Sequence, residues 1–400
     1  MTWEWLMTTT NVADVRNLAT VWAAILACCC GWGGGHAMAQ QDQPLIEIVR
    51  SGPSGDAVIE RALDSRSQGD FQQLPLTEVV AKLATHHKIP IVIDTLALDE
   101  EGIRADIPVT ANLTGDTLAE GLSKICEQAK IAWTLRDEAL VITSPSSAEQ
   151  DCRVRVYRVG RGVNHAQLIQ DITTTVQPAG WDEVGGLYSI APFYTGVVIN
   201  HTLKGHREIA NRYRKQLALV SGRPTRLREL AQPPALNKLV AVRFQKTPLE
   251  EAAKAVAAAC KIDVVLDRNA LDNDGIAATT PVTLEVSGLT LDAALRHALA
   301  PLGLTFIVER NGLKVTSKTA AESNLVPVTY SVARLVPGQQ YDPLIEALTR
   351  CVAANSWSDV GGAGKVAVGA QAGTLSVLQT QANQLRINQF VADLNGLAGR

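Results

Sequence analysis

Two aspartates that recur at predicted strand ends are the residues of this chain best suited by type to acid–base or cation chemistry. Asp94 and Asp267 each close a short β-branched run, and a second acid follows each of them, Asp99 or Asp272. Paired carboxylates at such a place could bind a cation or exchange protons. A capping role, in which each aspartate begins the next short helix, accounts for the same pattern, and we favour it.

The histidines show no metal or catalytic spacing. His86 and His87 end a predicted helix, where a histidine suits the helix dipole without any reactive role, so we interpret them as surface or capping residues. The HExxH pattern of a helical zinc site and the GxSxG elbow of a serine hydrolase are both missing from the sequence. The remaining histidines considered, none of which has a histidine at its repeated position, are His165, His201, His206 and His297.

A glycine-rich run ending in lysine offers weak evidence for phosphate binding. Gly361–Lys365 lacks the full GxxxxGK[ST] spacing of a phosphate loop, and a second Gly-Gly pair, Gly185-Gly186, has no lysine after it. We therefore predict a tight turn that enters a strand. The tryptophans just before these turns, Trp181 and Trp357, are predicted to fill module cores. We expect no catalytic, cofactor-binding or metal-binding residue.

Four cysteines remain after the N-terminal region, and their spacing excludes a CxxC metal pair. They are Cys126, Cys152, Cys260 and Cys351. Scattered core thiols explain them. Because the chain is predicted to be exported, one or two disulfides, for example between Cys126 and Cys152, remain the alternative.

One basic segment departs from the composition of the whole chain. The chain has a net charge of −3, whereas residues 203–230 carry eight bases against two acids, a local charge of 8 − 2 = +6. A solvated helix face is one explanation. We hypothesise instead that it docks an acidic partner, an anionic lipid or a cell-wall polymer. Its bases are Lys204, Arg207, Arg212, Arg214, Lys215, Arg223, Arg226 and Arg228.

Composition and the N-terminus set the class of protein. With 46% apolar and 19% charged residues the chain is globular, and its near-neutral balance gives no general affinity for nucleic acid. An apolar run from Leu18 to Cys30, followed by Ala37-Met38-Ala39, predicts a signal peptide over residues 1–39. We therefore expect a periplasmic or outer-envelope protein without a later membrane span. A lipid anchor at Cys28 and a retained membrane anchor stay open.

The chain is a tandem duplication. Residues 75–144 align without a gap with residues 248–317, and 24 of these 70 positions are identical. A second repeated unit follows each first one, and both copies of it contain a Trp-x-x-Val-Gly-Gly turn. The predicted order is residues 40–64 as an N-terminal extension, module A1 (65–150), module B1 (151–220), a proline-containing linker (221–237), module A2 (238–320) and module B2 (321–400).

Hydrophobic periodicity predicts an α+β fold for these modules. In module A, apolar residues at helical spacing follow Leu76 and Leu249, short β-branched runs follow them, and Thr117-x-x-Glu120 caps a second helix. Thr247–Glu250 is predicted to be another capping box, and Asn311-Gly312 a hairpin turn. We expect mixed sheets in the order β-α-β-β-α-β-β for module A, and β-α-β-β-α for module B.

Module A resembles the secretin and TonB N-terminal short domain, a small α/β module of outer-membrane secretins and TonB-dependent receptors. The second copy carries the resemblance at Phe244, Thr247–Glu250, Ile262–Asp267, Pro281–Thr283, Leu291, Leu295 and Val315–Ser317. The first copy carries it at Leu76, Ile91–Asp94, Pro108–Thr110, Leu118 and Leu140–Ser144, with a degraded opening strand near Arg66–Phe71. Module B more loosely resembles the K-homology-like ring-building repeats of secretins.

The resemblance implies protein docking rather than catalysis. A secretin needs a C-terminal pore domain and a TonB-dependent receptor a barrel, and this sequence stops at Arg400, directly after module B2. We expect a non-enzymatic envelope protein whose repeated modules dock or scaffold other proteins. The alternatives are an accessory subunit of a secretin-type secretion or transport complex, a TonB-type signalling adaptor and an enzyme.

Overall fold

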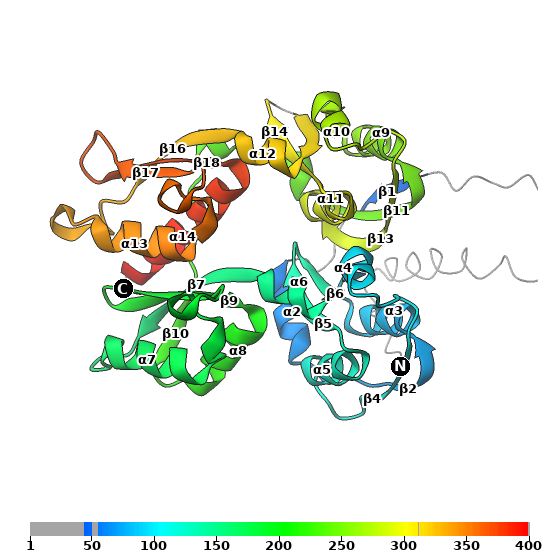
Figure 1. The fold of residues 1–400 in the computed structure, drawn as a ribbon, viewed down its shortest axis with the longest axis horizontal. Helices are drawn as coiled ribbons and strands as arrows, with labels where there is room; N and C mark the ends of the chain where they lie inside the picture. Colours follow the sequence, from blue (N-terminus) through cyan, green and yellow to red (C-terminus); the bar gives the residue numbers. More distant parts are fainter. Residues whose placement is uncertain (1–43, 50–54, 311, 399–400) are drawn as a thin grey trace, which may run out of the picture. The chain divides into compact units, whose positions relative to one another are not determined.

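The computed structural model describes residues 44–49, 55–310 and 312–398. Pro44–Arg400 form one compact unit. The predicted signal peptide, with Cys28 and the cleavage site before Gln40, lies outside the described residues. Helices and small sheets alternate along the chain (Figure 1), so the predicted α+β fold of repeated mixed-sheet modules is confirmed.

Module A1 has two small sheets, β2-β4 and β3-β6-β5, packed with helices around one apolar core. The preceding helix α2 (Asp56–Leu63) adds Ile59 and Leu63 to that core. In the second sheet, β3 runs parallel to β6 and β5 antiparallel to it. The elements are β2 (Asp70–Pro75), α3 (Leu76–His87), β3 (Ile91–Ile93), α4 (Thr95–Glu100), β4 (Pro108–Asn112), α5 (Leu118–Ala129), β5 (Ala132–Arg136), β6 (Ala139–Thr143) and α6 (Pro145–Gln150).

Module A2 repeats this order with one added strand. The N-terminal strand β1 (Leu45–Ile48) joins its first sheet, which has the order β1-β11-β13, and the second sheet is β12-β15-β14. The expected hairpin between β14 and β15 is present, but Gly312 is the first residue of β15 and pairs with Glu309, so it is a strand residue rather than the predicted turn residue. The elements are β11 (Leu239–Pro248), α9 (Leu249–Cys260), β12 (Val264–Leu266), α10 (Arg268–Asn273), β13 (Pro281–Thr290), α11 (Leu291–Leu299), β14 (Leu304–Glu309), β15 (Gly312–Ser317) and α12 (Lys318–Ser323).

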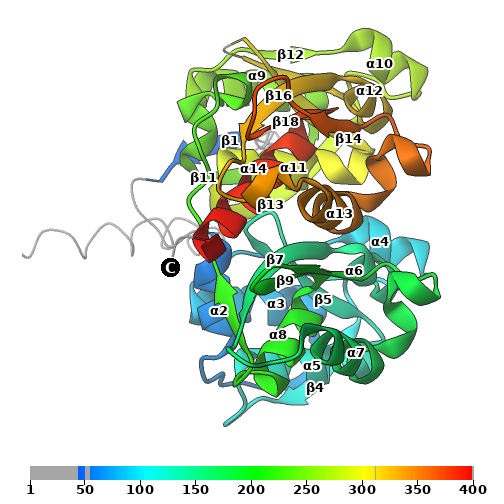
Figure 2. The same ribbon diagram turned by 90° about the vertical axis from the view of Figure 1, so that its left-hand side faces the viewer.

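The B modules each place two helices against an antiparallel sheet. Module B1 has the sheet β10-β7-β9-β8, and module B2 has β16-β18-β17. Figure 2 shows α14 beside β16 and β18 in module B2. The elements are β7 (Cys152–Val159), α7 (His165–Thr175), β8 (Ser189–Phe193), β9 (Gly196–Thr202), α8 (Leu203–Arg212) and β10 (Leu217–Val220), then β16 (Leu325–Ser331), α13 (Asp342–Cys351), β17 (Lys365–Val368), β18 (Thr374–Thr380) and α14 (Gln381–Ala398).

Of the two predicted capping boxes, one is correct and one is wrong. Thr117 and Glu120 form both reciprocal hydrogen bonds at the start of α5. Thr247 instead lies buried inside β11, and α9 begins after Pro248 without any side-chain cap. Two backbone carbonyls of the loop between α10 and β13 accept the first helical N–H groups instead, Leu249 N donating to Thr280 O at 2.9 Å and Glu250 N to Ala278 O at 3.0 Å. The free N–H groups of a helix start need acceptors of either kind.

The two halves share buried surface. The sheet of module B1 is apolar on both faces, and its Val156, Ala191, Phe193 and Val198 belong to the core cluster of module B2. Arg350 on α13 forms an ion pair with Asp182 of module B1, with a 2.7 Å Nε–Oδ2 distance. In the described part of the chain no helix has the length and apolar character required for a membrane span.

Candidate interaction site

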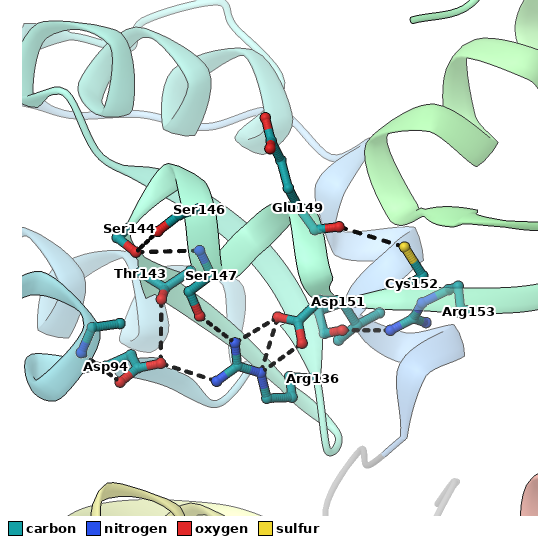
Figure 3. A network of polar contacts seen from close by, with 12 residues as sticks. Asp94, Arg136, Thr143, Ser144, Ser146, Ser147, Glu149, Asp151, Cys152 and Arg153 are labelled. Carbon is teal, nitrogen blue, oxygen red and sulfur yellow. Dashed lines mark hydrogen bonds and ion pairs between the residues drawn. The ribbon is translucent and has the colours of Figure 1, made fainter. Parts of the chain in front are cut away.

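The recurring acid of module A1 is a helix cap held by an arginine. Asp94 Oδ1 accepts from the Ala97 N–H at the start of α4, at 3.3 Å. Its other oxygen lies 3.0 Å from Arg136 Nη1 and accepts from the Thr143 hydroxyl at 3.2 Å (Figure 3). Arg136 also pairs with Asp151, with a 2.7 Å Nη2–Oδ2 distance. The carboxylate is thus fully engaged within the module.

In module A2 the corresponding aspartate, Asp267, also caps a helix, but its basic partner is a lysine. Asp267 caps α10 through Ala270 N at 3.4 Å, and it pairs with Lys314 Nζ at 2.9 Å. Lys314 lies on β15, whereas Arg136 lies on β5. The hydrogen bond from Lys314 lowers the pKa of Asp267. The capping interpretation is confirmed in both copies, and the base beside each acid is a second structural partner that sequence spacing did not reveal.

A buried histidine of module B1 makes the bonds that a glutamine makes in module B2. His206 Nε2 lies 2.8 Å from the Arg153 carbonyl, so this nitrogen donates, and Nδ1 accepts from the Tyr157 hydroxyl at 2.9 Å. At the corresponding position Gln384 Nε2 donates to the Val326 carbonyl at 2.6 Å, and Gln384 Oε1 accepts from Tyr330 at 2.8 Å. The imidazole replaces an amide, which identifies His206 as a packing residue.

The second buried histidine of module B1 is only partly satisfied. His201 Nδ1 accepts from Thr202 N at 2.8 Å, while Nε2 has no hydrogen-bond partner among the described residues. Its ring stacks on Tyr188 with centroids 3.8 Å apart, and Trp181 lies edge-on at 5.2 Å. Burial lowers the pKa of His201 to about 4, and burial followed by the charge of Arg155 lowers the pKa of His206 well below its usual value. Both rings are therefore neutral near pH 7.

His87 and His297 make separate structural contacts. His87 lies at the end of α3 between the hydroxyls of Ser65 and Ser67, at 3.0 and 3.1 Å. Burial, and then the nearby His86, lowers the pKa of His87. His297 donates through Nε2 to the carbonyl of Asp137, at 3.1 Å. No cluster of His, Cys, Asp and Glu in the described ranges could hold a metal ion.

The cysteines, tryptophans and glycine turns lie within the modules. The four thiols after the N-terminal region are free in the structure, and burial raises the pKa of Cys126 and Cys351 to about 12, which makes both poor nucleophiles. Trp181 and Trp357 are buried as predicted, and each indole donates to the backbone at 2.8 Å. Gly361 adopts a positive φ of 91°, which ends a short 3-10 turn before β17, so the tight-turn prediction is confirmed.

The predicted basic segment spans three elements. Lys204, Arg207 and Arg212 lie on α8, Arg214 and Lys215 lie between α8 and β10, and the linker carries the remainder, Arg223, Arg226 and Arg228. The linker is held to α14, because Asp393 accepts from Gly222 N at 2.7 Å and Asn388 donates to the Thr225 carbonyl at 2.8 Å. All of these bases except Arg207 are exposed.

Two bases of this segment border a cavity of about 360 Å³. Lys204 and Arg207 of α8 line it together with Lys124 and Ser123 of α5 and the indole of Trp133. Arg207 pairs with Asp64 at 2.5 Å, and Lys124 pairs with Asp116 at 2.6 Å. Lys204 forms no ion pair within the described residues. The arrangement offers a free ammonium beside a half-exposed aromatic ring.

The second half has a cavity at the same place but of different character. It measures about 840 Å³, and Phe306 stands where Trp133 stands in the first half. The residues at the positions of Lys204 and Arg207 are Ala382 and Leu385. Arg296 replaces Ser123, and its guanidinium lies 5.0 Å above the Phe306 ring. Bases at these two positions therefore mark the first half alone, as the alignment of α8 with α14 shows, although α14 contributes Arg386 to the second cavity.

Comparisons with known proteins give little. No family model matches the chain, and no curated protein matches it. Among solved structures, a chain of the Salmonella SPI-1 injectisome base is similar at 15% identity and a TM-score of 0.18, over 38% of this chain and 94% of that chain. Similarity at this level assigns neither a family nor an activity, so the resemblance of module A to the secretin and TonB short domain stays a prediction.

Proposed function

We propose that this chain is a non-enzymatic, exported cell-envelope protein whose repeated modules dock other proteins. The observation that supports it most is the cavity between α5 and α8, where Trp133 lies beside Lys204 and Arg207. The second half keeps an aromatic ring at this place but has other bases around its cavity, Arg296, Lys318 and Arg386. A surface that differs between two copies of one fold is a candidate for a specific partner.

The hydrogen-bonded polar residues of the modules support the non-enzymatic part of the proposal. Asp94 and Asp267 cap helices, and His206 makes the bonds of Gln384. A catalytic side chain must have an atom that can contact the substrate. The hydrogen bonds of these side chains are made to residues of their own module. The finer proposal, that the partner belongs to a secretin-type or TonB-type complex, rests on the resemblance of the modules.

Charge reversal of exposed bases tests the proposal. The triple variant Lys204→Glu, Arg214→Glu, Lys215→Glu changes side chains that lie on the surface, and it leaves the Arg207–Asp64 ion pair in place. We expect it to fold normally and to lose at least tenfold in association with envelope fractions, measured by cross-linking and co-sedimentation at low and physiological salt.

The matched control changes the same total charge elsewhere. Lys254, Lys318 and Lys365 are also exposed, and they lie in the second half. Their reversal to glutamate should leave association unchanged. Equal association of wild type and the first triple variant would refute docking through the basic segment.

A further inference from the structure

The edge strand β14 of module A2 borders the cavity of the second half. Five consecutive residues of β14, Leu304 to Val308, line this cavity of about 840 Å³, and residues 379–383 at the junction of β18 and α14 line it from module B2. In the sheet β12-β15-β14 this strand has a neighbour on one side only. A strand edge beside a cavity of this size has room for an extended ligand.

The register of the hairpin shows which backbone groups of β14 face the open edge. Lys318 N donates to the Gly303 carbonyl at 3.3 Å, so every second residue counted from Gly303 bonds to β15. By the alternation of an antiparallel pair, Phe306 and Val308 point their N–H and C=O groups away from β15. Among the described residues, neither backbone group of Phe306 has a hydrogen-bond partner. Phe306 therefore offers one donor and one acceptor at the edge.

The next residue on this edge is already paired with an amide from module B2. Val308 N donates to Gln381 Oε1 at 2.8 Å, and Gln381 Nε2 donates to the Val308 carbonyl at 3.3 Å. A neighbouring strand would make this same pair of bonds. The Gln381 side chain thus substitutes for one residue of a strand, and it shows that an amide fits against this edge.

The first half has a different arrangement at the corresponding edge. There β5 takes the place of β14, and the carbonyl of Leu135, at the position of Val308, accepts from Arg153 Nη2. Leu203 stands at the position of Gln381, and the cavity measures only about 360 Å³. An edge that pairs with a side-chain amide, with room beside it, is therefore a feature of the second half.

The cavity of the second half has an excess of positive charge. Its lining contains three bases and two acids, a charge of 3 − 2 = +1. Arg296 pairs with Asp137, with a 3.8 Å Nε–Oδ1 distance. Arg386 of α14 is exposed and forms no ion pair within the described ranges. An acidic side chain on a ligand would therefore meet a free guanidinium.

We propose that the open edge of β14 is a docking site for an extended, acidic segment of a partner protein. The segment pairs with Phe306, replaces the Gln381 amide at Val308 and directs a carboxylate toward Arg386. This deepens the proposed docking role with a second site, and it rests on that role only for the existence of a natural partner. The site itself is testable with a designed strand as the probe.

A labelled peptide of alternating residues, Val-Glu-Val-Glu-Val-Glu-Val, is titrated against the full chain. We expect saturable binding that slows hydrogen exchange at the Phe306 amide and leaves the Ile307 amide, which already bonds to β15, unchanged. Absence of binding, or binding that leaves exchange at Phe306 as it was, would overturn the proposal.

Two modified peptides separate strand pairing from attraction between charges. One carries N-methyl groups on its valines and the other on its glutamates, so each loses the hydrogen bonds of one edge only. One isomer should bind like the unmodified peptide and the other should not bind. Equal effects of methylation in the two isomers would contradict pairing with an edge strand.

Charge reversal on α14 tests the acidic character of the segment. Arg386→Glu should weaken peptide binding at least tenfold, and a peptide with lysines in place of its glutamates should bind this variant more tightly than wild type. The matched control is Arg334→Glu, because Arg334 is exposed in the same module and lies outside the cavity lining. The control should leave binding unchanged, and equal affinities of wild type and Arg386→Glu would refute an acidic segment.

Removal of the competing amide tests the replacement of Gln381. Gln381→Ala frees the Val308 backbone groups, so the peptide no longer displaces a side chain and should bind at least threefold more tightly. Unchanged or weaker binding would overturn this step. Near-ultraviolet circular dichroism confirms folding of each variant. None of these measurements depends on envelope association, so the failure of one proposal is distinguishable from the failure of the other.

Discussion

Modules B1 and B2 share a fold but differ at two buried polar positions, His206/Gln384 and His201/Gln379. In module B1, His201 accepts from the following N–H at 2.8 Å, and in module B2, Gln379 Oε1 accepts the equivalent bond from Thr380 N at 2.9 Å. Gln379 Nε2 then donates to the Ser356 hydroxyl at 2.6 Å, whereas Nε2 of His201 has no partner among the described residues. At this position the histidine therefore makes fewer hydrogen bonds than the glutamine of module B2.

Neighbouring residues differ in step with this exchange. Gly205 of module B1 corresponds to Asn383 of module B2. A Cβ atom at Gly205 would lie 2.0 Å from His201 Nδ1. Conversely, Tyr188 stacks on His201 where module B2 has Gly364, whose Cβ would lie 2.0 Å from Gln379 Nε2. Side chains that change together to preserve packing indicate a constraint of the core rather than of catalysis.

Removing the imidazole of His206 should have the largest effect. His206→Ala leaves the Tyr157 hydroxyl and the Arg153 carbonyl without a partner and opens a cavity, so we expect a loss of about 4 kcal/mol in the free energy of unfolding. Urea denaturation measures it. Gln384→Ala in module B2 should cost a similar amount, and a loss below about 1 kcal/mol in either would contradict the equivalence of the two positions.

Acid should destabilise module B1 more than module B2. Because the pKa of His201 is lowered to about 4 in the folded chain, the unfolded chain binds the proton first as the pH falls. The stability contribution is therefore complete above pH 6.5 and declines between pH 6.5 and 4, by about 3 kcal/mol at 1.36 kcal/mol per pKa unit.

Unfolding measured across that pH range tests this decline, with His201→Gln as the control. The control should lose the part of the pH slope that His201 supplies, while the carboxylates contribute equally to both proteins. Parallel pH profiles for the two proteins would show that His201 is not held neutral by the fold.

A single methyl group at Gly205 should discriminate the two copies. Gly205→Ala forces the His201 ring to move, and we expect a loss of about 2 kcal/mol despite the better helix propensity of alanine. The matched change Asn383→Ala removes only the 3.1 Å bond to Gln379 Oε1 and should cost less than about 1 kcal/mol. Thermal unfolding of both variants measures the two losses of stability. Equal losses would show that the Gly205 and Asn383 positions do not differ in packing.

The outer faces of the two sheets should respond differently to one substitution. Val198 is buried against module B2, and the corresponding residue in module B2 is the half-exposed Ser376. Val198→Ser should therefore cost about 2 kcal/mol, whereas Ser376→Val should change stability by less than about 0.5 kcal/mol. A small effect at Val198 in chemical denaturation would show that the shared core contributes little.

The repeat and its elements were predictable, because hydrophobic periodicity and aligned identities are local signals. The alignment of the two halves also places His206 opposite Gln384. In the sequence we asked only whether a histidine recurs at the repeated position, so we did not consider that a glutamine could make the same hydrogen bonds. The capping box at Thr247 failed for a physical reason. Two carbonyls from the loop before β13 supply the helix start, and no spacing within residues 247–250 records them.

The candidate site was predictable only in part. The basic segment stood out by charge, but its division between α8, a turn and the linker depends on how Gly222 and Thr225 bond to α14. Strand β1 was missed altogether, since four residues with one half-buried side chain give no periodic signal.

The central claim, that the buried polar side chains hold the modules together and that the protein acts by docking, is tested most directly by His206→Gln. This change installs the side chain of module B2 in module B1, where the amide can keep both hydrogen bonds. We predict a free energy of unfolding within about 1 kcal/mol of wild type and unchanged envelope association. A folded variant that loses association, or that loses an activity detected in the wild type, would contradict the account.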